Sequence, residues 1–122
     1  MIEPVSFKGV RLNGGFIIAG VQFTAAPMVD ALEREAIAQT SIVGREFRLL
    51  IRAGLSEREL SITLYHEILE AATVGSLRPP DTVMEFNEGD FERAAQAAHA
   101  ELGNATPENL NRMLQSFGFR ED

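Results

Sequence analysis

The stretch TLYHEILEAATVG, residues 63–75, places His66 beside Glu67 and four residues before Glu70. On an ideal helix, side chains four residues apart lie one turn from each other, about 40° apart around the axis. Histidine nitrogens and carboxylate oxygens can each bind a divalent cation at about 2 Å. His66 and Glu70 can therefore share one metal ion. An amphipathic helix with a solvated polar stripe has the same spacing, so both interpretations stay open.

The helix that must carry these residues has clear signals at both ends. Ser56 and Glu59 have the spacing of a capping box, so the helix is expected to begin just after Ser56. It is expected to run to about Val74, because Gly75 is a typical residue after a helix and a Pro-Pro pair at 79–80 prevents continuation. The side opposite His66 is mostly apolar, with Leu60, Leu64, Ile68, Leu69, Ala71 and Ala72.

The segments before this helix contain strand signals. Asn13-Gly14 separates two apolar segments, 5–12 and 15–23, and predicts a β-hairpin with a two-residue type I′ turn. Residues 46–52 alternate and predict a half-buried strand, with Phe47, Leu49 and Ile51 on one face. Residues 28–38 have apolar side chains at helical spacing and predict a helix, although the part from Ile37 onward also fits a strand.

Two further helices are predicted after the His66 helix. One has Asn87 as its N-cap and stops at Gly103, and the other has Thr106 as its N-cap and ends at Gly118. Strands followed by helices indicate an α+β fold. We therefore expect residues 1–122 to form one α+β domain, in which an N-terminal antiparallel β-sheet packs on the His66 helix and two more helices follow.

Composition excludes several classes of function. The 122-residue chain has no cysteine, which excludes disulfides, thiolate metal sites and cysteine nucleophiles. Its net charge of −7 argues against nucleic acid as a partner. The longest apolar run, FIIAGV, is too short to cross a bilayer, so no membrane partner is expected. Because no secretion signal is recognisable, we expect the cytoplasm as its location.

The His66 segment resembles the active-site helix of zincin metallopeptidases, whose motif is His-Glu-x-x-His. In that family both histidines bind zinc, and the glutamate beside the first is the base that deprotonates the metal-bound water. The resemblance implies that His66 is a metal ligand and Glu67 the catalytic base. In zincins the strand before this helix borders the cleft and can hold an extended substrate, which suggests that role for residues 46–52.

A second similarity concerns NEGDFE, residues 87–92. The gluzincin branch takes its third metal ligand from a glutamate on the next helix, in a pattern such as Asn-Glu-x-x-x-Asp. The resemblance implies that Glu88 is this ligand, because the turn at 79–80 can bring Glu88 back over His66. Together the similar segments span roughly residues 46–102, under half the chain.

The chain departs from the zincin pattern at Glu70, which stands where zincins have the second histidine. A site of His66, Glu70 and Glu88 has two anionic ligands instead of one. More oxygen donors shift the preference from zinc toward harder ions such as manganese, and more anionic ligands lessen the Lewis acidity of the ion. A carboxylate-rich metal site, a zincin-like fold without metal and a chance similarity all remain open.

Two other residues invite a chemical role. His99 lies 11 residues after Glu88 on the same predicted helix, roughly 16 Å along the axis, so the two cannot share an ion. Tyr65, the only tyrosine, is expected to pack against a neighbouring element. The leading hypothesis is thus a metal-dependent, peptidase-like hydrolase or its degenerate relative, with zinc or manganese as the ion. The alternative is a non-catalytic module that binds a protein or peptide along its sheet edge.

Overall fold

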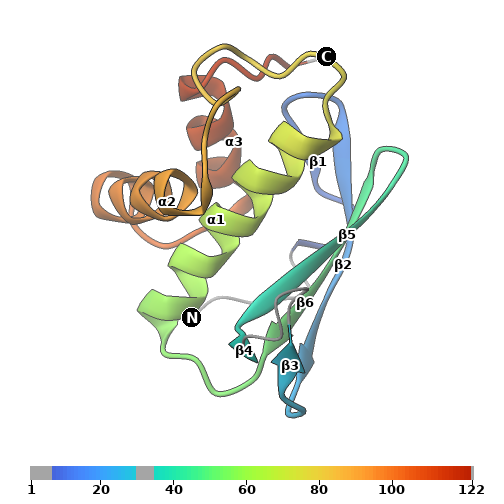
Figure 1. The fold of residues 1–122 in the computed structure, drawn as a ribbon, viewed down its shortest axis with the longest axis vertical. Helices are drawn as coiled ribbons and strands as arrows, with labels where there is room; N and C mark the ends of the chain where they lie inside the picture. Colours follow the sequence, from blue (N-terminus) through green and yellow to red (C-terminus); the bar gives the residue numbers. More distant parts are fainter. Residues whose placement is uncertain (1–6, 30–34, 122) are drawn as a thin grey trace.

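The computed structural model describes residues 7–29 and 35–121. Strands occupy the first half of the chain and helices the second, which confirms the α+β class (Figure 1). The main sheet has the order β1-β2-β6-β5, and β3 pairs with β4 in a separate small sheet. The strands are β1 (Arg11–Leu12), β2 (Phe16–Thr24), β3 (Met28–Val29), β4 (Glu35–Ala36), β5 (Ala38–Val43) and β6 (Glu46–Arg52).

The main sheet is mixed, so the expectation of a wholly antiparallel sheet was wrong. β2 and β6 run parallel, with Ile18 opposite Phe47 and Phe23 opposite Ile51. The β1–β2 and β5–β6 pairs are antiparallel. Hairpin signals specify only pairs of strands joined by a short turn, whereas a parallel pair needs a longer crossover. Here the crossover from β2 to β6 contains β3, β4 and β5.

The N-terminal hairpin forms as predicted, with a different loop. Leu12 pairs with Phe16, so the loop has the three residues 13–15. Gly14 and Gly15 both have positive φ angles, 95° and 85°, which glycine adopts without steric cost. The observed strand β1 is much shorter than the strand predicted at 5–12, because residues 7–9 form a turn. Residues 5 and 6 lie outside the described part.

The predicted helix at 28–38 is wrong at the positions that the structure describes, 28–29 and 35–38. Met28 and Val29 pair with Ala36 and Glu35 as a short antiparallel ladder, and β5 begins at Ala38. The remaining positions of this prediction, 30–34, lie outside the described residues. A helical spacing of few apolar residues is also compatible with short strands, and here β3 pairs with β4 while Ala38 pairs with Ile51 of β6. The alternative of a strand from Ile37 onward is close to the observed start of β5.

Three helices follow, α1 (Glu57–Gly75), α2 (Glu88–Leu102) and α3 (Pro107–Ser116). Their N-caps are Ser56, Asn87 and Thr106, as the sequence predicts, and the first two close capping boxes. In Figure 1, α1 lies between the sheet and the other two helices. Within the described residues, no helix combines the length and apolarity needed to cross a membrane.

The core forms where α1 packs on the sheet. Phe47, Leu49 and Ile51 of β6 are buried, as their alternation predicts. Leu64, Ile68 and Leu69 of α1 are buried as well. Because burying such a side chain stabilises a fold by about 1.5–3 kcal/mol, these contacts fix the rotation of α1 about its axis. The polar stripe of α1 is thereby held beside β5 and the start of α2.

Candidate metal centre

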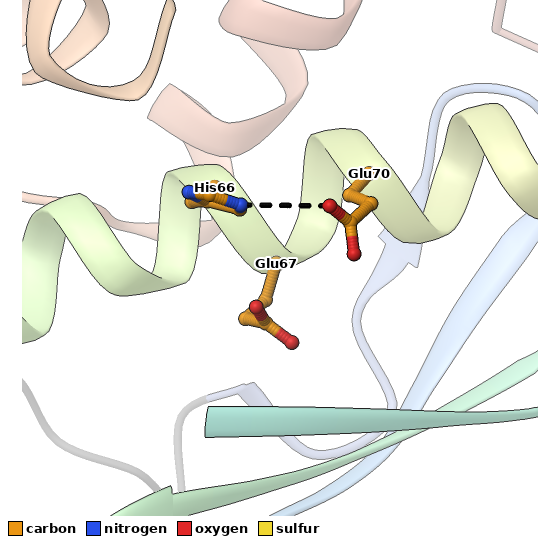
Figure 2. Close-up of side chains that lie close together, drawn as sticks. All are labelled: His66, Glu67 and Glu70. Atoms are coloured by element: carbon orange, nitrogen blue, oxygen red, sulfur yellow. Dashed lines mark ion pairs between the residues drawn. The ribbon is translucent and has the colours of Figure 1, made fainter. Parts of the chain in front are cut away.

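The three residues of α1 lie together on its polar side. Figure 2 shows His66 and Glu70 one turn apart on the same side, with Glu67 turned toward the neighbouring sheet. The Nε2 atom of His66 is 3.5 Å from Oε2 of Glu70. One ligand atom from each of His66, Glu67 and Glu70 lies within 4.8 Å of the others. These three residues thus form a group that could hold a metal ion.

Glu88 approaches His66 from a different helix. It is the first residue of α2, directly after the cap Asn87, and its Oε2 is 3.2 Å from Nε2 of His66. The carboxylates of Glu70 and Glu88 therefore converge on the same imidazole nitrogen. The side chain of Glu88 is 72% exposed, whereas that of His66 is only 15% exposed. Glu88 thus closes the solvent side of the cluster.

Glu92 is a member of the site that the sequence analysis did not single out. Its Oε1 lies 2.9 Å from Nδ1 of His66. The available signal was its position four residues after Glu88, which puts both carboxylates on one face of α2. A carboxylate on one nitrogen of a metal-binding histidine fixes the ring and leaves the other nitrogen for the ion. Glu92 contacts Nδ1 in this way, and Nε2 of His66 is the nitrogen that could bind an ion.

Glu67 is fixed in place beside the imidazole by a contact with the sheet. The hydroxyl of Thr40, in β5, donates a hydrogen bond of 2.8 Å to Oε1 of Glu67. Burial raises the pKa of Glu67, although the bond from Thr40 and the charge of His66 oppose this shift. Glu67 is therefore a half-buried carboxylate with increased proton affinity beside the imidazole.

The cluster lines a cleft of about 760 Å³ between α1, the start of α2 and the segment from Glu35 to Thr40. Of the main sheet, the edge strand β5 borders this cleft, and the short strand β4 lines it as well. The expected role of residues 46–52 is corrected here, because β6 lies between β2 and β5. The sequence could not show this, because the segment that becomes β5 overlapped the end of a predicted helix.

Four carboxylates around one imidazole change the proton affinities of the cluster. Burial of His66 favours its neutral form, but hydrogen bonds with Glu70 and Glu92 and the charges of Glu67 and Glu88 outweigh it and raise its pKa to about 9. Hydrogen bonding with Glu70, then burial and the Glu70 charge, raise the pKa of Glu88 to about 7. Without an ion, the cluster therefore retains protons to balance its negative charge.

The donor set fits a divalent cation. Oε2 of Glu70 is buried, and its 3.5 Å ion pair with Nε2 of His66 is at the outer limit for a hydrogen bond, so this oxygen is only weakly satisfied. A buried carboxylate oxygen that is only weakly satisfied is costly, and a cation would satisfy it better. One imidazole and two or three carboxylates suit zinc, and their oxygen content suits manganese better.

His99 and Tyr65 lie outside the cluster and connect helices instead. Nδ1 of His99 is 2.8 Å from the hydroxyl of Ser61, a fully buried residue of α1. The hydroxyl of Tyr65 donates to the carbonyl of Gly103 at 2.9 Å, which confirms that Tyr65 packs against a neighbouring element. Both contacts join α1 to the C-terminal end of α2.

Comparison of the chain with protein-family models, with curated proteins and with solved structures found no match. The geometry of the cluster and the chemistry of its side chains are therefore the basis for a functional proposal.

Proposed function

We propose that this protein is a metal-dependent hydrolase that cleaves peptide bonds. The observation that carries the proposal is the convergence of Glu70 and Glu88 on Nε2 of His66, with Glu67 directly beside them. Glu70 and Glu88 come from different helices, so their convergence is a property of the tertiary structure. A solvated polar stripe on α1 alone would not require a carboxylate from α2.

Each residue of the cluster has a distinct role in this proposal. His66, Glu70 and Glu88 hold the ion, and Glu92 orients the imidazole through Nδ1. A bound divalent ion lowers the pKa of water and polarises a carbonyl group. Glu67 accepts a proton from the attacking water and passes it to the leaving amine. Thr40 keeps the Glu67 carboxylate beside the cleft through its hydrogen bond.

An extended peptide is the substrate that the surroundings favour. The main-chain N–H of Arg52 donates to the carbonyl of Ile37 at 2.8 Å. Because hydrogen-bonded positions alternate along an antiparallel pair, the main-chain groups of Ala38, Thr40 and Ile42 face away from β6. A peptide strand paired with these groups would run along the cleft past Glu67.

Metal binding tests the ligand set. Calorimetric titration of the metal-free protein with manganese and zinc should show binding, weakened by at least about tenfold in His66→Ala and Glu70→Gln. Glu101→Gln is the matched control, because Glu101 is an exposed carboxylate of α2 that does not line the cleft. Equal affinities of wild type and His66→Ala would refute the proposed ligands.

The Glu67→Gln variant tests whether Glu67 acts as the catalytic base or as a metal ligand. This variant should bind the ion within about threefold of wild type, because Glu67 is not a ligand in the proposal. Its kcat on an unstructured peptide substrate should fall by roughly 10²–10⁴-fold, the usual contribution of a general base. Loss of metal binding together with activity would instead make Glu67 a ligand.

A non-catalytic peptide-binding module is the second candidate. It is favoured by the edge position of β5, whose outer main-chain groups are available for strand addition whether or not an ion is bound. Peptide affinity that is unchanged by a chelator and by His66→Ala, without turnover, would select this alternative.

A further inference from the structure

A second cleft lies at the C-terminal end of α1 and contains three arginines. Its volume is about 400 Å³, and its positive charge comes from Arg45, Arg78 and Arg120. The other lining residues are Gly14, Ser76, Leu77, Pro80, Gly118 and Phe119. Ser76 lies ten residues beyond His66, roughly 15 Å along the helix axis. We call this surface the arginine cleft.

Direct contacts hold its three segments together. The carbonyl of Gly14 accepts a 2.9 Å hydrogen bond from the guanidinium of Arg45, and the Gly14 N–H donates a 2.8 Å bond to the carbonyl of Arg120. Gly118 has a φ of +104°, and a Cβ there would meet the Pro80 ring at 3.1 Å. Figure 1 shows the N-terminal hairpin, the loop after α1 and the C-terminal segment gathered at one end of the molecule.

The arginine cleft has an excess of positive charge in an acidic protein. None of its lining residues is acidic. Among the described residues, Arg78 and Arg120 have no ion-pair partner, whereas Arg52, Arg93 and Arg112 pair with Glu35, Asp90 and Glu108. The C-terminal ends of α1 and α3 lie nearby, but each contributes only about half a negative charge. These partial charges offset part of the positive charge of three guanidinium groups.

An apolar side chain lies directly beside this charge. Leu77 lines the arginine cleft and is 98% exposed. Arginines around an exposed apolar side chain are typical of protein interfaces, in which arginine is enriched. Nucleic acid uses many phosphate contacts over a long surface, and the net charge of −7 opposes it. A short peptide needs only two or three ion pairs and one apolar contact.

We propose that the arginine cleft binds an acidic peptide segment of a partner protein. Carboxylates of the segment pair with Arg78 and Arg120, and an apolar side chain of the segment packs on Leu77. Arg45 contributes its charge, while its contacts with Gly14 and the Phe16 ring fix its position. This site is separate from the metal centre and does not depend on the proposed hydrolase activity.

Fluorescence anisotropy with a labelled Leu-Glu-Asp-Glu-Leu-Glu peptide at low salt tests the proposal. The double variant Arg78→Gln/Arg120→Gln should bind roughly 5- to 30-fold more weakly than wild type. The matched control is Arg48→Gln/Arg58→Gln, which changes the net charge equally at two exposed arginines outside the arginine cleft. This control should bind like wild type, and Leu77→Ser should weaken binding without changing the net charge.

Three results would overturn the proposal. The first is that wild type does not bind the peptide at concentrations up to about 1 mM. The second is that both double variants bind equally weakly, and the third is that Arg78→Gln/Arg120→Gln binds as tightly as wild type. Circular dichroism of each variant verifies that the fold is retained. The same measurement with a phosphorylated peptide compares phosphate with carboxylate as the ligand. Binding more than about tenfold tighter than the carboxylate peptide, with competition by inorganic phosphate, would replace the carboxylate ligand with a phosphate ligand.

Discussion

His66 is the residue around which the candidate metal centre is organised. Both of its nitrogens have carboxylate partners, Glu92 at Nδ1 and Glu88 with Glu70 at Nε2. Without an ion, a protonated imidazole satisfies these carboxylates. With an ion, the imidazole must be neutral, so binding has to displace its proton. Glu70 adds one negative charge relative to a second histidine and strengthens this competition between proton and metal.

The raised pKa of His66 predicts a pH dependence of stability in the metal-free protein. Its pKa is about 9 in the folded state and about 6.5 when unperturbed. The stabilisation is therefore complete below pH 6.5 and is lost as pH rises through 9. We expect the melting temperature to fall over this range and His66→Gln to lack most of the fall. A wild-type melting temperature that stayed constant from pH 6.5 to 9 would contradict the ion-pair network.

At the level of elements, α1 is fixed by contacts on two sides. Thr40 joins it to β5 through Glu67, and Ser61 joins it to the end of α2 and the loop before α3. The hydroxyl of Ser61 accepts a 2.9 Å hydrogen bond from the N–H of Ala105 and lies 2.8 Å from Nδ1 of His99. The position of Glu88 and Glu92 over His66 depends on this docking of α2 against α1.

Ser61→Ala tests the connection between α1 and α2. The change leaves the buried N–H of Ala105 without its acceptor, so we expect the free energy of unfolding to fall by about 2 kcal/mol. Ser41→Ala, at an exposed position of β5, should change it by less than about 0.5 kcal/mol. Denaturant titration followed by circular dichroism measures both. A loss below about 0.5 kcal/mol in Ser61→Ala would show that Ala105 finds another acceptor.

At the scale of the whole molecule, one helix connects both candidate sites. The middle of α1 carries the metal cluster, and its C-terminal end borders the arginine cleft. The same helix packs its apolar side into the core cluster that the described residues form. A partner at the arginine cleft and a peptide beside β5 would therefore contact different parts of one helix.

A common core predicts a single cooperative unfolding transition. Tyr65 is the only tyrosine and the chain has no tryptophan, so its fluorescence reports on the buried middle of α1. We expect the fluorescence and the far-ultraviolet circular dichroism to change at the same denaturant concentration. Leu69→Ala, at a fully buried position, should shift both midpoints equally and cost about 3 kcal/mol. Two separate transitions would instead indicate independently folding parts.

The features that the sequence alone determined are local. The capping residues Ser56, Asn87 and Thr106 place the helix starts, because each cap side chain accepts a hydrogen bond from the residue three positions later. The four-residue spacing puts His66 and Glu70 on one side of any helix. The alternation in residues 46–52 identified the buried face of β6, since side chains alternate in every strand.

The tertiary structure decided what depends on pairing between distant segments. The pattern of residues 28–38 also fits a helix, and pairing decides the outcome: β3 and β4 pair with each other, and β5 pairs with β6. The parallel pairing of β2 with β6 places β5 at the edge beside α1, and no local signal specifies that order. Glu92 meets His66 only because α2 docks on α1, so its contact required the packed fold.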